Sequence, residues 1–309
     1  MKSKALYKHV WAIAITPFTD DNKIDFKAIP KLMDWYINNG CDGVFANCQS
    51  SEMDYLSENE KEDLAKAVID CVDGRVPVVV SGHTSRDRRI QLEGIERVAK
   101  LGIDGYVLVS NTLDPENKGD EVFLKNYYET VNAFPHLKFG VYECPTPYKR
   151  LVTTEALKEL AENGLAFMKD TSCDPIILHE RLDAISGTGL KLMNANGETF
   201  LDSWEHGCAG YNGPMTNFHP QFYRWMLENY ETDYDLVKRM SELLTVYAAF
   251  NKGPYPMIAK YHMNLCGVPM GLNCRSKDIS LFNNLAKVWA ESFYSFECYI
   301  NNKLGIDWR

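Results

Sequence analysis

The chain lacks the features that mark membrane, nucleic-acid-binding and disulfide-stabilised proteins. No apolar stretch approaches the roughly 18 residues that a membrane helix needs, and no apolar core follows the charged first residues as in a signal peptide. No lysine or arginine cluster accompanies the net charge of −9, so nucleic acid is not an expected partner. The nine cysteines are odd in number and form no C-x-x-C pair. They are therefore predicted to be reduced, mostly buried thiols of a cytoplasmic protein.

Linkers and nucleotide-binding motifs are also missing. The 309 residues contain no low-complexity break, and 45% of them are hydrophobic, which supports one large core or a barrel with an extension. No G-x-G-x-x-G motif follows the first predicted strand, which weakens the alternative of a doubly wound nucleotide-binding sheet.

What the chain does contain is a regular alternation of apolar runs and amphipathic helices. The helix predicted over residues 57–72 opens with a Ser57-x-x-Glu60 capping box, and its apolar positions fall on one face. The eight predicted strands cover residues 10–15, 43–47, 76–81, 105–110, 139–142, 165–168, 190–193 and 210–213.

A weak internal repeat connects predicted helix ends to strand starts. Gly40-Cys-Asp-Gly43, Gly102-Ile-Asp-Gly105 and Gly207-Cys-Ala-Gly210 each precede a predicted strand, and the first glycine of each can end a helix in the left-handed conformation. The first two copies lie 62 residues apart (102 minus 40), which fits two βα units of about 31 residues. Eight such units predict an α/β fold of the (β/α)8 TIM-barrel type.

Strand patterns stop near residue 220. Helices are predicted over residues 222–227, 236–250 and 279–294, which is too much chain for the eighth barrel helix alone. We therefore expect barrel strands and loops in residues 1–220. The last barrel helix and a C-terminal helical extension should occupy residues 221–309 of the same structural unit. The extension is expected to pack on the side of the barrel or against another subunit.

Lys169 is the most informative residue of the chain. It closes an apolar run and is followed by Asp170-Thr-Ser. Burial disfavours the charged form of a lysine, and a neutral amine can attack a carbonyl carbon to form a Schiff base. Tyr142 closes another run, so both side chains are predicted at the carboxyl-end face of the barrel, where active sites lie. The alternative is an ordinary lysine that reaches solvent just after a strand.

At this point the motifs resemble the dihydrodipicolinate synthase/N-acetylneuraminate lyase family of class I pyruvate-dependent aldolases. The resemblance covers residues from about 8 to 300, and the order and spacing of its motifs carry it. The motifs are Thr16-Pro-Phe18, Gly40-x-Asp-Gly43 with Glu52-x-x-x-Leu56-Ser57, Tyr142-x-x-Pro145, Lys169-Asp-Thr-Ser172, and Gly207-x-x-Gly210 through Asn217 and Pro220.

The resemblance implies a lysine-imine mechanism without a cofactor or metal. Lys169 would form the imine with a 2-oxo acid such as pyruvate, Tyr142 would shuttle a proton, and an aldehyde would be the second partner. Ser50 and Ser51 match residues whose hydroxyl and backbone N–H groups hold the pyruvate carboxylate. A homotetramer is also implied. The substrate-binding residues indicated in this way are Gln49, Ser50, Ser51, Thr171, Asn196, Glu198 and Gly213.

Several positions depart from the family pattern. Gln49 replaces a hydroxyl of the proton relay, and an amide cannot relay a proton as a hydroxyl does. Residues 110–115 lack the usual tyrosine pair, and Pro147 replaces the arginine of the synthase branch. Glu198 and Thr171 resemble the lyase branch instead. The resemblance is therefore closer to the lyase and aldolase side than to true dihydrodipicolinate synthase.

The leading interpretation is a lyase or aldolase that reversibly cleaves a 2-oxo-3-deoxy sugar acid, such as N-acetylneuraminate, to pyruvate and an aldehyde. One alternative is a sugar-acid dehydratase that uses the same imine, or a condensation like that of dihydrodipicolinate synthase. Another is a non-catalytic 2-oxo-acid-binding protein, motivated by the altered relay. Retention of both Lys169 and Tyr142 argues against the last.

Overall fold

The computed structural model describes residues 9–250 and 254–307. Its eight strands form a closed barrel in which every strand runs parallel to its neighbours and the last pairs with the first. This confirms the predicted (β/α)8 barrel. The strands are β1 (His9–Ile13), β2 (Gly43–Ala46), β3 (Val78–Val80), β4 (Gly105–Val109), β5 (Phe139–Tyr142), β6 (Phe167–Asp170), β7 (Lys191–Asn194) and β8 (Gly210–Tyr211).

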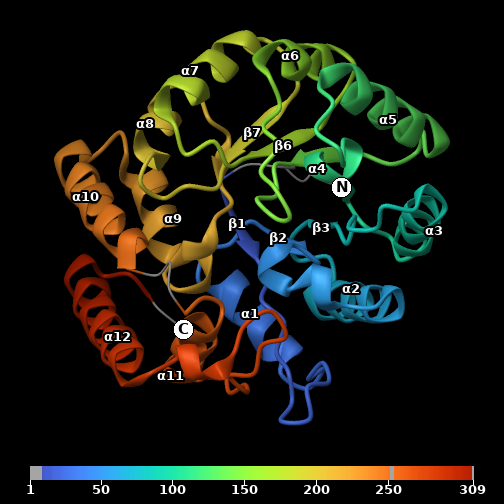
Figure 1. Ribbon diagram of the computed structural model, residues 1–309. Helices are drawn as coiled ribbons and strands as arrows, with labels where there is room; N and C mark the ends of the chain where they lie inside the picture. The colour runs from blue at the N-terminus through green and yellow to red at the C-terminus, as the bar shows by residue number, and fades with distance from the viewer. Residues whose placement is uncertain (1–8, 251–253, 308–309) are drawn as a thin grey trace.

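Helices surround the strands in a ring, and the last three gather on one side of it (Figure 1). The first nine are α1 (Ile29–Asn38), α2 (Glu58–Val72), α3 (Arg88–Ala99), α4 (Ser110–Leu113), α5 (Asp120–Ala133), α6 (Thr154–Glu162), α7 (Pro175–Ala184), α8 (Phe200–Glu205) and α9 (Pro220–Asn229). The extension adds α10 (Tyr234–Phe250), α11 (Met257–Leu265) and α12 (Asn284–Leu304).

Local sequence signals explain where these elements begin and end. Ser57 caps α2 by accepting a bond from the Glu60 amide, and the Glu60 carboxylate accepts one from the Ser57 amide in return. The three repeat glycines, Gly40, Gly102 and Gly207, all have positive φ, at 90°, 82° and 98°. The chain thus turns from helix to strand with glycine at the position that disfavours a side chain.

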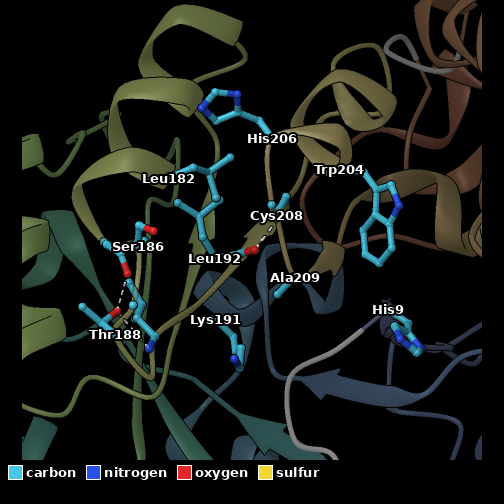
Figure 2. Close-up of a pocket in the computed structure, with 14 residues that line it drawn as sticks. His9, Leu182, Ser186, Thr188, Lys191, Leu192, Trp204, His206, Cys208 and Ala209 are labelled. Carbon is cyan, nitrogen blue, oxygen red and sulfur yellow. Dashed lines mark hydrogen bonds between the residues drawn. The ribbon is translucent and has the colours of Figure 1, made fainter.

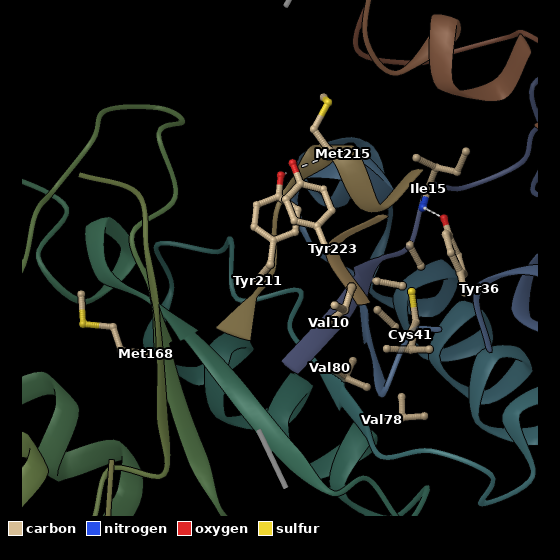
Figure 3. Packing of buried hydrophobic residues seen from close by; sticks show 14 of the residues in the cluster. Val10, Ile15, Tyr36, Cys41, Val78, Val80, Met168, Tyr211, Met215 and Tyr223 are labelled. Atoms are coloured by element: carbon tan, nitrogen blue, oxygen red, sulfur yellow. Dashed lines mark hydrogen bonds between the residues drawn. The ribbon is translucent and has the colours of Figure 1, made fainter. Parts of the chain in front are cut away.

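The core has two layers. Alternate strand residues point outward and belong to one buried cluster with the helices, which includes Val10, Val78 and Val80 on the strands and Tyr36 on α1 (Figure 3). The other residues point inward and fill the barrel. A side chain at Gly43 would overlap Trp11. Side chains therefore fill the interior below the carboxyl ends of the strands, the ends at which such barrels place their catalytic groups.

Several predicted segments have different bounds in the structure, and two of these differences affect the argument. The strand predicted at residues 165–168 starts later and extends through Lys169, which pairs with Met193 of β7. Lys169 is therefore inside a strand and held by neighbours on both sides. The helix predicted from residue 279 begins only at Asn284, because Asn283 caps it by accepting from the Ala286 amide.

The extension also contains α11, which the sequence pattern did not reveal. Helix α10 packs beside the barrel against α8 and α9, as expected of the extension. Residues between α10 and α12, among them Tyr255 and Ser276, also reach the mouth of the barrel. All nine cysteines are free thiols, as predicted. Only four of them are buried, so the prediction that most would be buried was wrong. No helix in the described ranges is long and apolar enough to cross a membrane.

Candidate active site

A cavity of about 540 Å³ opens where the carboxyl ends of the strands meet the loops that follow them. Lys169 and Tyr142 form its floor, and the loops after β2, β5 and β7 form much of its wall. The C-terminal extension contributes Tyr255, Ser276 and Lys277. Seven of the nine residues predicted from the sequence line this cavity: Gln49, Ser50, Tyr142, Lys169, Thr171, Asn196 and Glu198.

Lys169 and Tyr142 lie side by side at the bottom of the cavity. They are register partners on β6 and β5, and the Lys169 amine lies 4.6 Å from the centre of the Tyr142 ring and 5.4 Å from that of Phe45. Burial lowers the pKa of Lys169 to about 8, although Cys48 and Cys144 oppose the shift. About a tenth of the amine is therefore neutral at pH 7, against less than a thousandth at the ordinary value.

A buried ion cluster fixes the two strand ends from behind. Glu143 and Asp170 directly follow Tyr142 and Lys169, and both carboxylates bind the guanidinium of Arg181 on α7. Glu143 also accepts bonds from the Thr171 amide at 3.0 Å and the Val152 amide at 2.7 Å. Arg181 thereby ties β5 and β6 to the same helix.

Tyr142 donates a hydrogen bond to Gln49, the residue that replaces the relay hydroxyl. Its hydroxyl lies 3.2 Å from Gln49 Oε1, and the Gln49 amide nitrogen donates in turn to Thr146 at 2.6 Å. Burial raises the pKa of Tyr142 well above its ordinary value, so the phenol stays protonated. Because Gln49 offers an oxygen without a proton, the tyrosine proton has an acceptor here but no hydroxyl relay beyond it.

Residues 110–115, which lack the tyrosine pair, stabilise the loop after β5 instead. Asn111 on α4 donates to three backbone carbonyls of the loop after β5, those of Cys144, Thr146 and Tyr148, at 2.8, 2.9 and 2.6 Å. This single amide holds the loop that places Thr146 against Gln49. Sequence reasoning missed Asn111 because nothing local distinguishes it from an ordinary helix-start residue.

Ser51 and Gly213, which were also predicted to bind substrate, are not among the residues that line the cavity. The Ser51 hydroxyl donates to the Ala14 carbonyl at 2.6 Å, and its amide bonds the Cys48 carbonyl at 3.0 Å. Gly213 lies behind the wall, where a side chain would overlap the Ala195 carbonyl. Thr171 does line the cavity, but its hydroxyl donates to the Glu143 carbonyl at 2.7 Å.

Asn196 and Glu198 form a polar pair on one wall. The Asn196 amide nitrogen donates to Glu198 Oε2 at 2.7 Å, and its oxygen accepts from the Thr199 amide at 3.0 Å. The pair is therefore ordered before any ligand arrives. It presents a carboxylate and an amide to the cavity, groups that suit hydroxyl-bearing ligands.

Lys149, rather than Arg150, supplies a cation after β5. Arg150 is buried outside the cavity, where it pairs with Asp114 at 2.8 Å and Asp120 at 2.9 Å. Lys149 lines the cavity and donates to the Thr171 carbonyl. Pro147 is not among the lining residues. A point charge thus replaces the planar fork that an arginine would offer.

The extension is anchored to the loop after β2 by Glu52. This buried carboxylate accepts bonds from the Arg275 and Ser276 amides, both at 2.7 Å, and lies 3.3 Å from the Lys260 amine. Glu52 thus joins the loop after β2 to the C-terminal extension through three separate contacts. No local pattern indicates these partners, because they lie more than 200 residues further along the chain.

A second hollow, of about 400 Å³, lies at the opposite end of the barrel (Figure 2). His9 and Lys191, the first residues of β1 and β7, line it together with Trp204. Since catalytic groups of such barrels come from the carboxyl ends of the strands, this hollow is not the candidate active site.

Comparison with known proteins agrees with this geometry. A model of the Dihydrodipicolinate synthetase family matches residues 6–281. The chain belongs to this family. Among curated proteins, 4-hydroxy-tetrahydrodipicolinate synthase of Staphylococcus carnosus (strain TM300) is 27% identical over 251 residues, which cover 78% of this chain and 83% of that one. Members of the family are pyruvate-dependent class I aldolases and synthases.

Solved structures share the fold at low sequence identity. Dihydrodipicolinate synthase DapA-2 from Bacillus anthracis superposes with a TM-score of 0.84 at 18% identity, covering 94% of this chain and 98% of that one. YagE, a prophage protein from E. coli K12 whose structure is a complex with pyruvate, gives 0.83 at 20% identity, covering 98% and 100%. The curated relative is named as a synthase, so the preference for the lyase side is not supported.

Proposed function

We propose that the protein is a lysine-imine enzyme that forms or cleaves a carbon–carbon bond between a pyruvate-like 2-oxo acid and an aldehyde. The observation that carries this is the Lys169 amine, whose pKa burial lowers to about 8, beside Tyr142 in an open cavity. No residue of the described ranges accepts a hydrogen bond from this amine, so it is available to a ligand.

The chemistry follows from these groups. The amine adds to the keto carbon, water leaves, and the imine draws electrons from C3 when a proton is removed there. The resulting enamine attacks the aldehyde carbon, and Tyr142 delivers or removes the proton on the aldehyde oxygen. Hydrolysis of the imine returns the free lysine, and cleavage runs the same steps in reverse.

Synthase-type condensation is the first candidate for the second half of the reaction. The curated synthase relative supports it, and Lys149 supplies a cation on the wall for an aldehyde that carries a carboxylate. Cleavage of a 2-oxo-3-deoxy sugar acid is the second candidate, favoured by the Asn196–Glu198 pair, which suits hydroxyl groups.

Borohydride reduction with pyruvate tests the shared first step. The wild type and a Lys191→Ala control should gain one pyruvate-derived mass, located on Lys169, while Lys169→Ala and Lys169→Arg should gain none. Arginine stays protonated and cannot serve as the nucleophile. A wild type that gains no mass at any pyruvate concentration would leave a non-catalytic binding protein as the better description.

A substrate panel then separates the two candidates. Pyruvate consumption is followed with aspartate semialdehyde and with hydroxylated aldehydes. With 2-oxo-3-deoxy sugar acids, pyruvate release reports cleavage, and the formation of dehydration products reports a dehydratase. Condensation with a carboxylated aldehyde should weaken in Lys149→Met and not in Glu198→Gln. The reverse pattern, with sugar acids as the best substrates, would replace the first candidate by the second.

We also propose that the protein assembles as a homotetramer. An exposed apolar row on α12, formed by Leu285, Val288, Phe296 and Tyr299, supports a contact between copies. Sedimentation at micromolar concentration should give four times the chain mass of 35.3 kDa, and a single species at the monomer mass would contradict the proposal.

A further inference from the structure

Tyr255 enters the cavity from the C-terminal extension and touches the serine proposed to hold the 2-oxo acid. Its hydroxyl lies 2.7 Å from Ser50 Oγ and 2.9 Å from the side-chain nitrogen of Asn217. Tyr255 and Ser50 both line the cavity with Lys169. Tyr255 belongs to none of the sequence motifs and takes no part in the proposed imine chemistry.

The direction of each hydrogen bond around Tyr255 can be assigned. The side-chain nitrogen of Asn217 faces the Ile13 carbonyl at 3.0 Å, and only a donor satisfies a carbonyl. The same nitrogen therefore also donates to the Tyr255 oxygen. On the other side of the amide, the Asn217 oxygen accepts from the Tyr36 hydroxyl.

The chain of bonds starts at the backbone of the barrel. The Ile15 amide donates to the Tyr36 oxygen at 3.4 Å, as Figure 3 shows, which leaves the Tyr36 proton for Asn217. Every member thus accepts from one side and donates to the other. The last donor in the row is Tyr255, and its proton points at Ser50.

Ser50 cannot turn its own proton toward Tyr255, because that side of its oxygen already accepts a hydrogen bond. No acceptor for its hydroxyl proton exists among the residues of ranges 9–250 and 254–307. The free direction is the cavity, which Ser50 lines. Burial raises the pKa of Tyr255, so this donor keeps its proton across the working pH range.

We infer that Tyr255 is a positioning residue that makes Ser50 an obligate hydrogen-bond donor to the carboxylate of the bound 2-oxo acid. The inference rests on the proposed function for the identity of the ligand. A hydroxyl that could also donate to Tyr255 would have to reorient when the ligand binds, whereas that direction is already excluded for Ser50. The C-terminal extension would thereby set affinity for the 2-oxo acid, not only cover the barrel.

A double-mutant cycle on pyruvate binding tests the inference. Dissociation constants are measured by calorimetry for the wild type, Tyr255→Phe, Ser50→Ala and the double variant, with Tyr128→Phe as control. Tyr128 bonds Glu159 on the barrel exterior, so its variant should bind as the wild type does. Ser50→Ala should weaken binding about tenfold or more, the effect of losing a bond to a charged group. Tyr255→Phe should weaken it about 3- to 10-fold.

The decisive comparison is the effect of Tyr255→Phe when Ser50 is already alanine. A tyrosine that acts through Ser50 should then change the dissociation constant less than twofold, because coupled positions are not additive. An equal effect in both backgrounds, or none in the wild-type background, would overturn the inference. Thermal unfolding of all variants identifies any loss that comes from misfolding, and Ser50→Ala alone must still weaken binding.

The outcome is separable from that of the proposed function. Calorimetry reports binding whether or not an imine forms, while borohydride trapping reports the imine. Binding with the expected coupling but no trapped adduct would reject the enzyme and keep the role of Tyr255. A wild type that does not bind pyruvate at all would reject both.

Discussion

Tyr142 and Lys169 are register partners on adjacent strands, with the Lys169 amine 4.6 Å from the centre of the Tyr142 ring. The residues that follow them, Glu143 and Asp170, share Arg181 on the outer side of the sheet. Because successive side chains of a strand point to opposite faces, one strand pair serves both purposes. The Lys169 and Tyr142 side chains face the cavity while the ion cluster holds their backbones in place.

Imine formation should depend on pH through Lys169. Below its pKa of about 8 the neutral fraction of the amine falls about tenfold per pH unit, so the rate of pyruvate trapping should fall in step. Initial trapping rates between pH 5.5 and 10 measure this. A midpoint near the ordinary lysine value of 10.5 would show that the amine is not desolvated.

Replacing Lys169 by methionine should stabilise the fold. The pKa of Lys169 is lower in the folded state than in the unfolded state, so a charged lysine must lose its proton or its hydration when the chain folds. The resulting loss of folding free energy grows as pH falls from 10.5 to about 8 and is constant below that. The variant's free energy of unfolding at pH 7 should exceed that of the wild type by at most about 3 kcal/mol. Urea unfolding at pH 7 and pH 10.5 checks it, and an equal gain at both would point to packing instead.

Tyr142→Phe should separate proton transfer from imine formation. Its loss should lower kcat by about 10²–10⁴-fold, the usual contribution of general acid–base catalysis, while pyruvate is still trapped on Lys169. Steady-state rates and trapping on the same preparation measure the two steps. A kcat equal to that of the wild type would mean that the tyrosine only packs against the lysine.

Arg181→Met should destabilise the barrel strongly. It leaves Glu143 and Asp170 buried without their cation, which costs about 3–5 kcal/mol in comparable clusters. The matched control is Arg89→Met, whose exposed pair with Glu93 should matter by about 0.5 kcal/mol or less. Urea midpoints measure both. Similar small losses of unfolding free energy in the two variants would show that Arg181 does not stabilise the two strand ends.

The C-terminal extension should lose stability in alkali. Glu297 on α12 lies between His219 and His262, which it meets at 2.8 and 2.7 Å. Burial alone would lower the pKa of His262, but Cys266 and Glu297 raise it to about 10. The stabilisation is therefore complete below about pH 6.5 and lost as pH rises towards 10.

His262→Gln measures this contribution. The difference in unfolding free energy between wild type and variant should be largest near pH 5.5 and shrink steadily to pH 10. Glu297 sets the acid limit of this stabilisation. Burial alone would raise the pKa of Glu297, but the two histidines lower it by more, so its contribution to stability is lost only in acid. A difference that stays constant from pH 6 to 10 would mean that His262 is not charged in the fold.

The sequence by itself determined the strands, the turns and the pairing of Lys169 with Tyr142 in one cavity. These depend on local patterns: apolar runs of strand length, glycines such as Gly40 at positive φ, and a lysine and a tyrosine at the ends of such runs. Once eight parallel strands close into a barrel, their carboxyl ends must meet. Lys169 and Tyr142 could therefore be brought together without coordinates.

Only the tertiary structure decided which other groups surround that pair. Tyr255 meets Ser50 across 205 positions of the chain, and Glu52 meets Arg275 across 223. Ser51 looked equivalent to Ser50 in the sequence, yet its hydroxyl turns to the Ala14 carbonyl and is lost to ligands. Such contacts depend on how the extension folds back and on which bonds each buried polar group must satisfy. No periodicity or spacing along the chain encodes those demands.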